Sequence, residues 1–364
     1  MSRKLSFDSW LFAIATIIVL LGMVMIYSAS AMIATQRFGH SSSYFLIRQG
    51  VFLGAGALLM FFLMHVNPAL LQDRRIQYGA LAMVALGLIV ALFQAPINGT
   101  HRWIDLPYFN LQPSEFAKPA MILFLASYLA RREDRINDLT GTLLPVGFIL
   151  ALFAGLILLG RDFGTATTLV LVACAMIFAA GLSWNYIAGA SLALIPAILY
   201  FAGSAAYRRE RLLTFLNPEA DPLGKGFQPM QSLIALGTGG LNGLGIGNGR
   251  QKLFFLPEPH TDFIFSIIGE ELGFIGAVLL LAAFALLAWR GYRIARLSQN
   301  RFAFYAALGC TLMIVIQALI NISVTLCLVP TKGIPLPLVS YGGSSLLASL
   351  MVVGLLLNFS QQSG

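Results

Sequence analysis

Long hydrophobic runs alternate with short polar segments along almost the whole chain. Ten of these runs approach or exceed the roughly 17–25 residues with which an α-helix crosses a membrane. They lie at residues 11–30, 46–65, 77–96, 115–130, 143–160, 165–183, 186–205, 262–289, 302–328 and 342–360. The pattern predicts an all-α, polytopic membrane protein with about ten transmembrane helices.

The composition narrows the class of protein further. Of the 364 residues, 58% are hydrophobic and only 10% are charged, whereas soluble domains carry about 25% charged residues. This excludes a soluble enzyme and a nucleic-acid-binding domain, although the net charge is +8. We expect residues 1–364 to form one integral membrane domain, whose function depends on its few polar residues.

The charged residues also suggest an orientation. An even number of spans places both termini on one side, and the cations of the short loops favour the cytoplasm for that side. The segment 206–261 between the seventh and eighth windows would then lie outside. Its apolar residues 253–256 predict a large ordered outer loop rather than a disordered linker. Six cations in this loop suggest an anionic ligand there: Arg208, Arg209, Arg211, Lys225, Arg250 and Lys252.

The same loop is rich in glycine. No G-x-G-x-x-G spacing follows a strand, so a dinucleotide-binding fold is excluded. Two interpretations stay open, namely plain turns or a close approach of the backbone to a ligand or to another helix. The residues concerned are Gly237, Gly239, Gly240, Gly243, Gly245, Gly247 and Gly249.

The most distinctive polar cluster is in residues 257–271. Glu258, His260 and Asp262 lie within five residues, at the start of an apolar window. Asp262 is a candidate general base, because partial desolvation raises the pKa of a carboxyl group. The alternative is a helix N-cap, in which the carboxylate accepts backbone N–H bonds.

Glu270 and Glu271 follow further inside the same window. On a continuous helix, Asp262, Ser266, Glu270 and Gly273 would share one face. Carboxylates within a membrane normally face a cavity or a cation. Two roles therefore remain open, structural pairing with an Arg or Lys and direct contact with a substrate.

Two further segments carry polar groups. In residues 111–118, Pro113 suits the first turn of a helix, and Glu115 and Lys118 form an i,i+3 pair that can also bond across helices. Arg102 and Lys118 are candidates for binding a diphosphate. Residues 332–345 contain two prolines and three glycines. Irregular backbone at membrane depth is tolerated where it lines a cavity, so we expect this segment to border a site. Its candidate substrate-binding groups are Lys332 and the hydroxyls of Ser340, Ser344 and Ser345.

Residues 102–104, 111–118, 257–271 and 337–345 together resemble the SEDS family (shape, elongation, division and sporulation), and the likeness covers nearly the whole chain. Residues 251–258 and 330–333 are closer to the cell-division branch, and residues 334–337 to the elongation branch. The family's essential aspartate falls on Asp262. Its outer-face polar residues fall on Arg102, Glu115, Lys118, Glu258 and His260. The sequence departs from the family pattern at Arg161, next to Asp162.

The resemblance implies a peptidoglycan glycosyltransferase of the bacterial cytoplasmic membrane that polymerises lipid II. It also implies a class B penicillin-binding protein and other membrane proteins of cell division or elongation as partners. No feature of the sequence calls for a cofactor. A divalent cation such as Mg²⁺ or Mn²⁺ is a candidate to help neutralise the negative charge of the departing diphosphate. One alternative function is a lipid II flippase, which the intramembrane carboxylates of Glu270 and Glu271 favour. Another is a non-catalytic scaffold, but that function does not explain Asp262.

Overall fold

The computed structural model describes residues 7–97, 99–107, 109–186, 188–189, 192, 224, 226–253, 255–330 and 333–362. Lys332 and most of the predicted window 186–205 lie outside these ranges, as do the predicted outer-loop cations Arg208, Arg209, Arg211 and Lys225.

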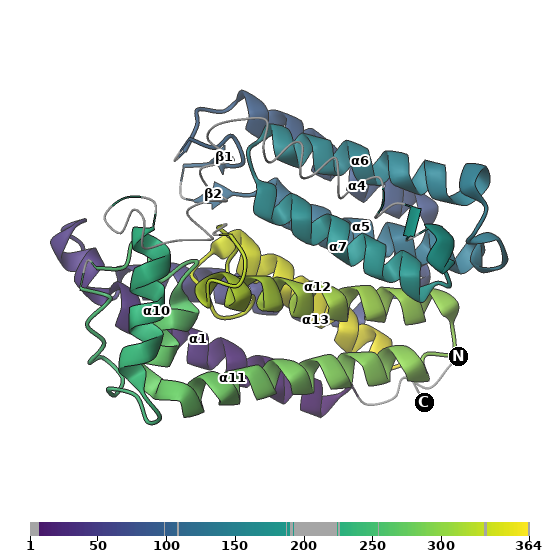
Figure 1. Cartoon of the computed structure of the whole chain (residues 1–364). Helices are drawn as coiled ribbons and strands as arrows, with labels where there is room; N and C mark the ends of the chain where they lie inside the picture. Colours follow the sequence, from purple (N-terminus) through teal and green to yellow (C-terminus); the bar gives the residue numbers. More distant parts are fainter. Residues whose placement is uncertain are drawn as a thin grey trace.

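The first half of the chain forms helices that run back and forth along one axis (Figure 1). They are α1 (Ser9–Gln36), α2 (Tyr44–His65), the short α3 (Pro68–Gln72), α4 (Arg74–Phe93), α5 (Pro113–Arg131), α6 (Leu144–Leu159) and α7 (Phe163–Ala179). A small antiparallel hairpin precedes α5, in which β1 (Ile104–Asp105) pairs with β2 (Asn110–Leu111). A 3-10 turn (Glu133–Arg135) and a π turn (Leu139–Leu143) connect α5 to α6.

The second half contributes α10 (Phe227–Gly239), α11 (Ile264–Leu297), α12 (Arg301–Thr325) and α13 (Gly343–Ser360). Nine of the ten predicted windows coincide with described helices of the chain, and the remaining window is the one at 186–205. Seven described helices are long and apolar enough to cross a membrane, with mean hydropathies from 1.7 to 2.5. The chain is therefore a multi-pass helical membrane protein, as predicted.

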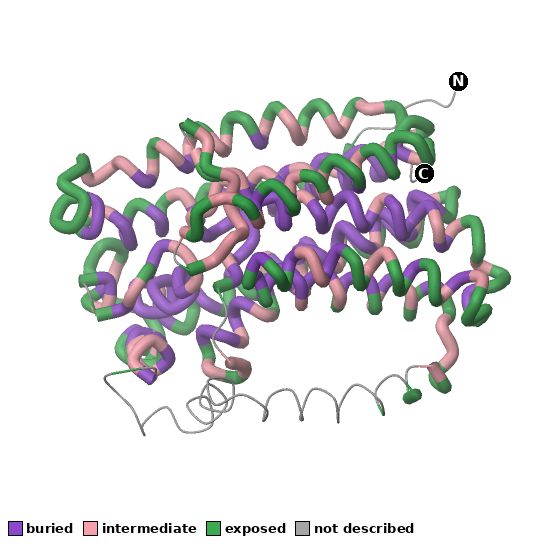
Figure 2. The backbone as a smooth tube through the Cα atoms, turned by 90° about the horizontal axis from the view of Figure 1, so that it is seen from above, coloured by how far each residue is buried: buried purple, intermediate pink, exposed green. Residues whose placement is uncertain are grey.

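Helices α5, α12 and α13 are buried along most of their length, and buried segments run through the middle of the molecule in Figure 2. In α13 83% of the most apolar window is buried, against 11% in α2, whose outer face stays exposed. Small residues let α13 and α2 approach each other. A side chain at Gly354 would lie 2.6 Å from the carbonyl oxygen of Met60, so only glycine fits. Close backbone approach of this kind stabilises helix pairs in membranes by packing.

A break in α11 was not predicted. Gly273 adopts φ 69° and ψ −168° inside the helix, which separates Ile264–Leu272 from the longer part that follows. Such a break leaves carbonyl and N–H groups without helical partners. The glycine-rich segment after α10 supplies them, because Leu244 and Gly245 donate to the carbonyls of Glu270 and Glu271 at 3.0 and 2.9 Å.

The glycines of this segment make that contact possible. A Cβ atom at Gly239 would lie 1.9 Å from the carbonyl oxygen of Gly269, and one at Gly243 would lie 2.2 Å from that of Glu271. Gly243 also has a φ angle of 79°, which residues other than glycine rarely adopt. Of the two interpretations left open, close approach to another helix is correct for Gly239 and Gly243, whereas a Cβ atom at Gly237, Gly240 or Gly247 would meet nothing within 4 Å.

The bundle has two distinct ends. Asp8, just before α1, donates its backbone N–H to Ser360 Oγ at the end of α13 (3.0 Å), so both termini lie at one end. The β1–β2 hairpin, α10 and the start of α11 lie at the opposite end, on the left in Figure 1. The polar segments predicted to carry function gather at that second end.

Candidate functional site

Asp262 lies in a turn just before α11, where two cavities meet. The cavities have volumes of about 320 and 250 Å³, and both are lined by Asp262, Arg102 and Gly333. The backbone carbonyl of Asp262 accepts a bond from Asn321 Nδ2 at 2.8 Å. Within the described ranges, no group donates a hydrogen bond to its carboxylate.

This geometry corrects two expectations. Helix α11 begins at Ile264 with Phe263 as its N-cap residue, and it has no side-chain capping bond. Asp262 therefore neither caps the helix nor belongs to a helical face shared with Ser266, Glu270 and Gly273. The physical reason is the turn at 259–263, which is held by Ser340 Oγ donating to the carbonyl of Thr261 at 2.6 Å.

Burial raises the pKa of Asp262 from 3.8 to about 6. The positive charge of Arg102 opposes this shift, whereas the negative charges of Glu258 and Asp162 reinforce it. A carboxylate with a pKa near 6 is mostly ionised at neutral pH and is more basic than an ordinary aspartate. It therefore suits general-base catalysis.

Gly333 limits the space around Asp262. A Cβ atom at residue 333 would lie 2.9 Å from Asp262 Oδ2. Any larger side chain would push the carboxylate out of its place between the cavities.

Arg102 lines both cavities together with Asp262. Its side chain is 26% exposed, and its Nη1 lies 3.6 Å from Asp162 Oδ1. Its Nε is buried and has no hydrogen-bond acceptor among the described residues. The guanidinium also lies over the ring of Trp103, 5.5 Å from the ring centroid. Arg102 thus retains donor capacity toward both cavities.

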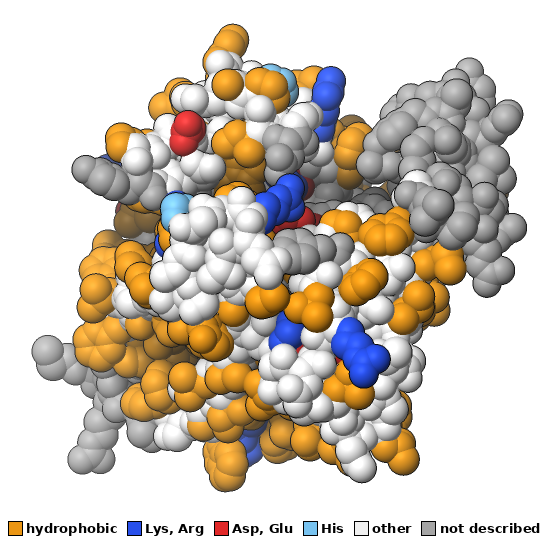
Figure 3. All heavy atoms as spheres, turned by 90° about the vertical axis from the view of Figure 1, so that its left-hand side faces the viewer, with side chains coloured by type: hydrophobic (Ala, Val, Ile, Leu, Met, Phe, Trp, Pro, Cys, Tyr) orange, Lys and Arg blue, Asp and Glu red, His pale blue; other side chains and the backbone are white. Residues whose placement is uncertain are grey.

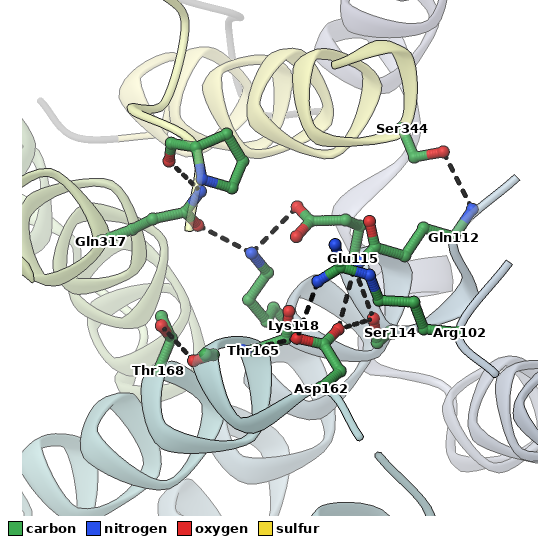
Figure 4. A network of polar contacts seen from close by, with 12 residues as sticks. Arg102, Gln112, Ser114, Glu115, Lys118, Asp162, Thr165, Thr168, Gln317 and Ser344 are labelled. Atoms are coloured by element: carbon green, nitrogen blue, oxygen red, sulfur yellow. Dashed lines mark hydrogen bonds and ion pairs between the residues drawn. The ribbon is translucent and has the colours of Figure 1, made fainter. Parts of the chain in front are cut away.

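Asp162 holds this part of the site together (Figure 4). Its Oδ2 accepts from Gln112 Nε2 and from Ser114 Oγ, both at 2.8 Å. Its Oδ1 accepts from the backbone N–H of Thr165 at 3.2 Å, which caps the start of α7. The contacts with Gln112 and Ser114 were missed from the sequence, because they join residues about fifty positions apart. The aspartate before Gly164-Thr165 was the only signal, and it indicates a helix cap.

A second ion pair lies deeper in the bundle. Lys118 Nζ donates to Glu115 Oε2 at 2.9 Å and to Gln317 Oε1 on α12 at 2.7 Å. Both predicted contacts of this pair, along the helix and across helices, are therefore present. Lys118 and Glu115 are each only 2% exposed, and neither lines the two cavities at Asp262. Their predicted role in binding substrate stays a prediction.

His260 is packed rather than paired. Its ring lies 4.6 Å from that of Phe45 and 5.5 Å from that of Tyr341, measured between centroids. Burial lowers its pKa to about 4, so the imidazole is neutral at pH 7. The 3.8 Å contact with Glu258 Oε2 is therefore no ion pair at that pH. Glu258 itself lines the larger cavity, with its side chain 55% exposed.

The irregular segment before α13 borders the same cavity, as predicted. Its lining residues include Gly333, Pro335, Tyr341 and Ser344. Ser344 Oγ accepts from the backbone N–H of Gln112 at 3.0 Å, which ties the segment to the start of α5. Binding of substrate by Ser344 stays a prediction, and Lys332 lies outside the described residues.

Glu270 and Glu271 are satisfied within the protein. Glu271 pairs with Lys252 Nζ at 2.6 Å and accepts from Ser28 Oγ at 2.7 Å. Glu270 accepts the backbone N–H groups of Arg250 and Gln251 at 2.7 and 3.1 Å. The predicted structural pairing with a cation is confirmed for Glu271, whereas Glu270 is bonded by backbone amides rather than by an Arg or Lys.

The described residues contain no group of three or more His, Cys, Asp or Glu side chains that could hold a metal ion. Magnesium is usually held by one or two carboxylates together with substrate phosphates. Asp262 and Glu258 line one cavity and match that smaller donor set.

Comparisons with known proteins identify the family. Residues 8–364 match the FtsW/RodA/SpoVE family of cell cycle proteins. The chain belongs to this family. It is 42% identical over 359 residues to the probable peptidoglycan glycosyltransferase FtsW of Trichlorobacter lovleyi, covering 98% of this chain and 94% of that protein. It is also 42% identical over 368 residues to stage V sporulation protein E of Bacillus subtilis, covering 100% and 99%.

Solved structures of the family have the same fold. A chain from a peptidoglycan synthase complex that coordinates polymerization and crosslinking aligns with a TM-score of 0.81 and 31% identity, over 98% of both chains. The rod shape determining protein RodA of Thermus thermophilus aligns with a TM-score of 0.72 and 29% identity, over 99% of this chain and 98% of that one. The predicted membership of the SEDS family is confirmed, as is the likeness to its cell-division member.

The end of the bundle that carries the site is seen face-on in Figure 3. Lys and Arg side chains stand near the middle of this face, with an acidic side chain beside one of them, and hydrophobic side chains cover much of the surroundings. An amphiphilic substrate with an anionic head group suits such a surface.

Proposed function

We propose that this protein is a peptidoglycan glycosyltransferase that polymerises lipid II, with Asp262 as its general base. One observation carries the proposal. The partly buried carboxylate of Asp262 has a pKa of about 6, accepts no hydrogen bond from the described residues, and borders two cavities at once. A reaction that joins two lipid-linked sugars needs a base between two substrate positions.

The reaction follows from this placement. The Asp262 carboxylate removes the proton from the 4-hydroxyl of the GlcNAc of lipid II. That oxygen attacks C1 of the MurNAc at the end of the growing chain, and the bond from C1 to the diphosphate oxygen breaks. Undecaprenyl diphosphate departs with the bonding electrons, and inversion at C1 turns an α-linked donor into a β-1,4 product.

Arg102 is suited to stabilise the leaving group. Negative charge develops on the diphosphate as the bond to C1 breaks, and fixed cations at that point lower the barrier. Asp162, itself held by Gln112 and Ser114, fixes the guanidinium beside Asp262. Lys118, which is paired with Glu115, also donates to Gln317 Oε1. Gln317 Nε2 in turn donates to the carbonyl of Pro335 at 3.0 Å, so this pair supports the segment that lines the larger cavity.

The participation of a divalent cation is a separate part of the proposal. Asp262 and Glu258 are the side chains that would hold Mg²⁺ or Mn²⁺ together with the diphosphate, where the ion would supply additional positive charge. Polymerisation assays with EDTA and with added Mg²⁺ or Mn²⁺ test this requirement.

The orientation in the membrane and the expected partner follow from the same reaction. Lipid-linked precursors are polymerised on the outer face of the bacterial cytoplasmic membrane, so the end with Asp262 faces outward and both termini face the cytoplasm. We expect a class B penicillin-binding protein as partner. The likeness to a chain of a peptidoglycan synthase complex supports this expectation.

The flippase alternative loses its main support. It rested on Glu270 and Glu271 as membrane-embedded polar groups available to a substrate. Both carboxylates are occupied by Lys252, Ser28 and backbone amides.

Reconstitution tests the proposal. The purified protein, together with a class B penicillin-binding partner, is given lipid II in detergent, and the products are sized on a gel. Wild type should yield glycan polymer, and the Asp262→Ala variant should yield none. Polymer from the variant, or none from wild type under any condition, would overturn the assignment. Transbilayer movement of labelled lipid II without polymer would support a flippase instead.

A further inference from the structure

A separate groove of about 700 Å³ lies between α1 and the segment 246–253. None of the described residues that line it also lines either cavity at Asp262. Its size falls within the range of about 300–1,000 Å³ that is typical of ligand pockets.

The walls of the groove are mostly apolar. One side of α1 contributes most of them, the start of α2 adds Leu46, and the opposite wall is formed by Ile246 and Leu253. Val24, Tyr27 and Ile246 are 47%, 44% and 57% exposed, so the groove is open at the side. In a membrane-spanning chain, a side opening lined by such residues faces acyl chains rather than water.

Polar groups stand at one part of the groove. Lys252 contributes no free charge, because Glu271 Oε1 lies 2.6 Å from its Nζ. The exposed side chain of Arg250 differs, since no carboxylate in the described part of the chain pairs with it. The guanidinium of Arg250 is therefore available to a phosphate group, which guanidinium binds strongly.

We propose that this groove binds one acidic glycerophospholipid, with an acyl chain along α1 and the phosphate at Arg250. An apolar groove with one unpaired cation among its described lining residues complements the shape and charge of such a lipid. The lipid-linked substrate is a poorer match, because its sugar must reach Asp262 and the groove shares no lining residue with the cavities there.

The lipid would also support the fold. The segment that forms one wall of the groove supplies the backbone N–H groups of Gly247, Arg250 and Gln251 to Glu271 and Glu270. These carboxylates fix the first part of α11. Lipid binding at the groove does not depend on the glycosyltransferase proposal and can be tested without any reaction.

The test measures lipid binding to the full-length protein by native mass spectrometry in detergent, with dioleoylphosphatidylglycerol as the probe. Ala31→Phe fills the groove from α1 and should weaken binding by about tenfold or more, because the acyl chain loses its apolar contacts. Leu20→Phe is the matched control, since Leu20 lies on the same helix, is 56% exposed and does not line the groove. Leu46→Trp fills the groove from α2 and replaces Ala31→Phe should that variant fail to fold.

The head group is tested separately. Arg250→Gln should weaken binding of dioleoylphosphatidylglycerol several-fold and leave binding of diolein, which lacks the phosphate, unchanged. Arg293→Gln, an exposed arginine near the other end of α11, should alter neither. Equal binding to the filled and control variants would overturn the site. Competition by inorganic phosphate would show an anion site instead, and preference for undecaprenyl phosphate over dioleoylphosphatidylglycerol would overturn the choice of lipid.

Discussion

Two sets of carboxylates lie within ten residues of each other around the start of α11, and their surroundings are opposite. Glu270 and Glu271 are fully buried, and each accepts several hydrogen bonds from the protein, with Lys252 as counter-ion for Glu271. Asp262 is partly exposed to two cavities, and its carboxylate accepts no hydrogen bond from the described residues. The structural and the candidate catalytic carboxylates therefore differ both in exposure and in the number of hydrogen bonds that the protein donates to them.

The difference is one of remaining hydrogen-bonding capacity. A carboxylate whose lone pairs are all used by internal donors stabilises the fold and has little left for a substrate. A carboxylate that is desolvated but not hydrogen-bonded costs stability, and the fold keeps it in place through its neighbours. The following predictions test this contrast by changing one set at a time.

The largest effect is expected for Asp262→Asn. Loss of a general base lowers rates by about 10²–10⁴-fold, and the variant should lose polymerisation of lipid II to that extent. Because no described hydrogen bond is broken, the protein should still fold. The ionised form of Asp262 is disfavoured in the folded state, so its removal should not lower the melting temperature at pH 7.5. A variant that melts well below wild type would break the contrast with Glu271.

Glu271→Gln should instead damage the fold. It leaves Lys252 buried without its counter-ion, and breaking a buried pair in this way costs about 3–5 kcal/mol. We expect a clearly lower melting temperature in detergent and a poor yield of folded protein.

The control for Glu271→Gln removes both charges. Lys252→Met combined with Glu271→Met should recover part of the lost stability, because no lone charge remains buried. If the single variant melts like wild type and loses only activity, Glu271 acts on the substrate and the distinction made above is wrong.

Gly333→Ala should disturb the position of Asp262 without disturbing the fold. Its Cβ would lie 2.9 Å from Asp262 Oδ2, and displacement of a catalytic group by about 1 Å can cost up to about 10²-fold in rate. We expect polymerisation to fall by about tenfold or more, with the melting temperature close to wild type. Gly342→Ala is a matched control, since its Cβ would meet only Ser345, at 3.6 Å. Equal rates for both variants would show that the carboxylate needs no such space.

The smallest effect concerns His260. Its pKa of about 4 in the folded protein lies below the ordinary 6.5. The unfolded chain therefore binds a proton between these values while the folded protein does not, and stability falls as the pH falls through this window. Between pH 7.5 and pH 5.5, the free energy of unfolding should therefore fall by about 1 kcal/mol less in His260→Phe than in wild type. Melting curves of both proteins at the two pH values measure this difference. If both proteins lose the same stability, the lowered pKa of His260 is contradicted.

The sequence predicted much of this architecture. Hydrophobic windows located nine described helices, and Pro113 marked the start of α5. Asp262 was singled out because Glu258, His260 and Asp262 lie within five residues at the start of an apolar window. These signals are local, so they could be read from composition and spacing.

The remainder depends on contacts between distant segments. The network of Asp162 with Gln112 and Ser114 joins α7 to α5, and each residue by itself resembles an ordinary helix-start residue. The break at Gly273 could not be predicted because its hydrogen bonds come from Leu244 and Gly245, outside the helix. The expectation of one polar face from Asp262 to Gly273 failed because Ser340, from another segment, holds Asp262 in a turn before the helix.

The central claim is that Asp262 acts as an ionised base, and the pH dependence of lipid II polymerisation tests it most directly. The pKa of Asp262 is raised from 3.8 to about 6, so the basic form disappears as the pH falls through about 6. Rates of wild type measured from pH 5 to pH 8 should fall to half near pH 6. Arg102→Gln should move this midpoint upward, because Arg102 lowers the pKa. A rate that stays constant down to pH 5 while the protein remains folded would contradict the account.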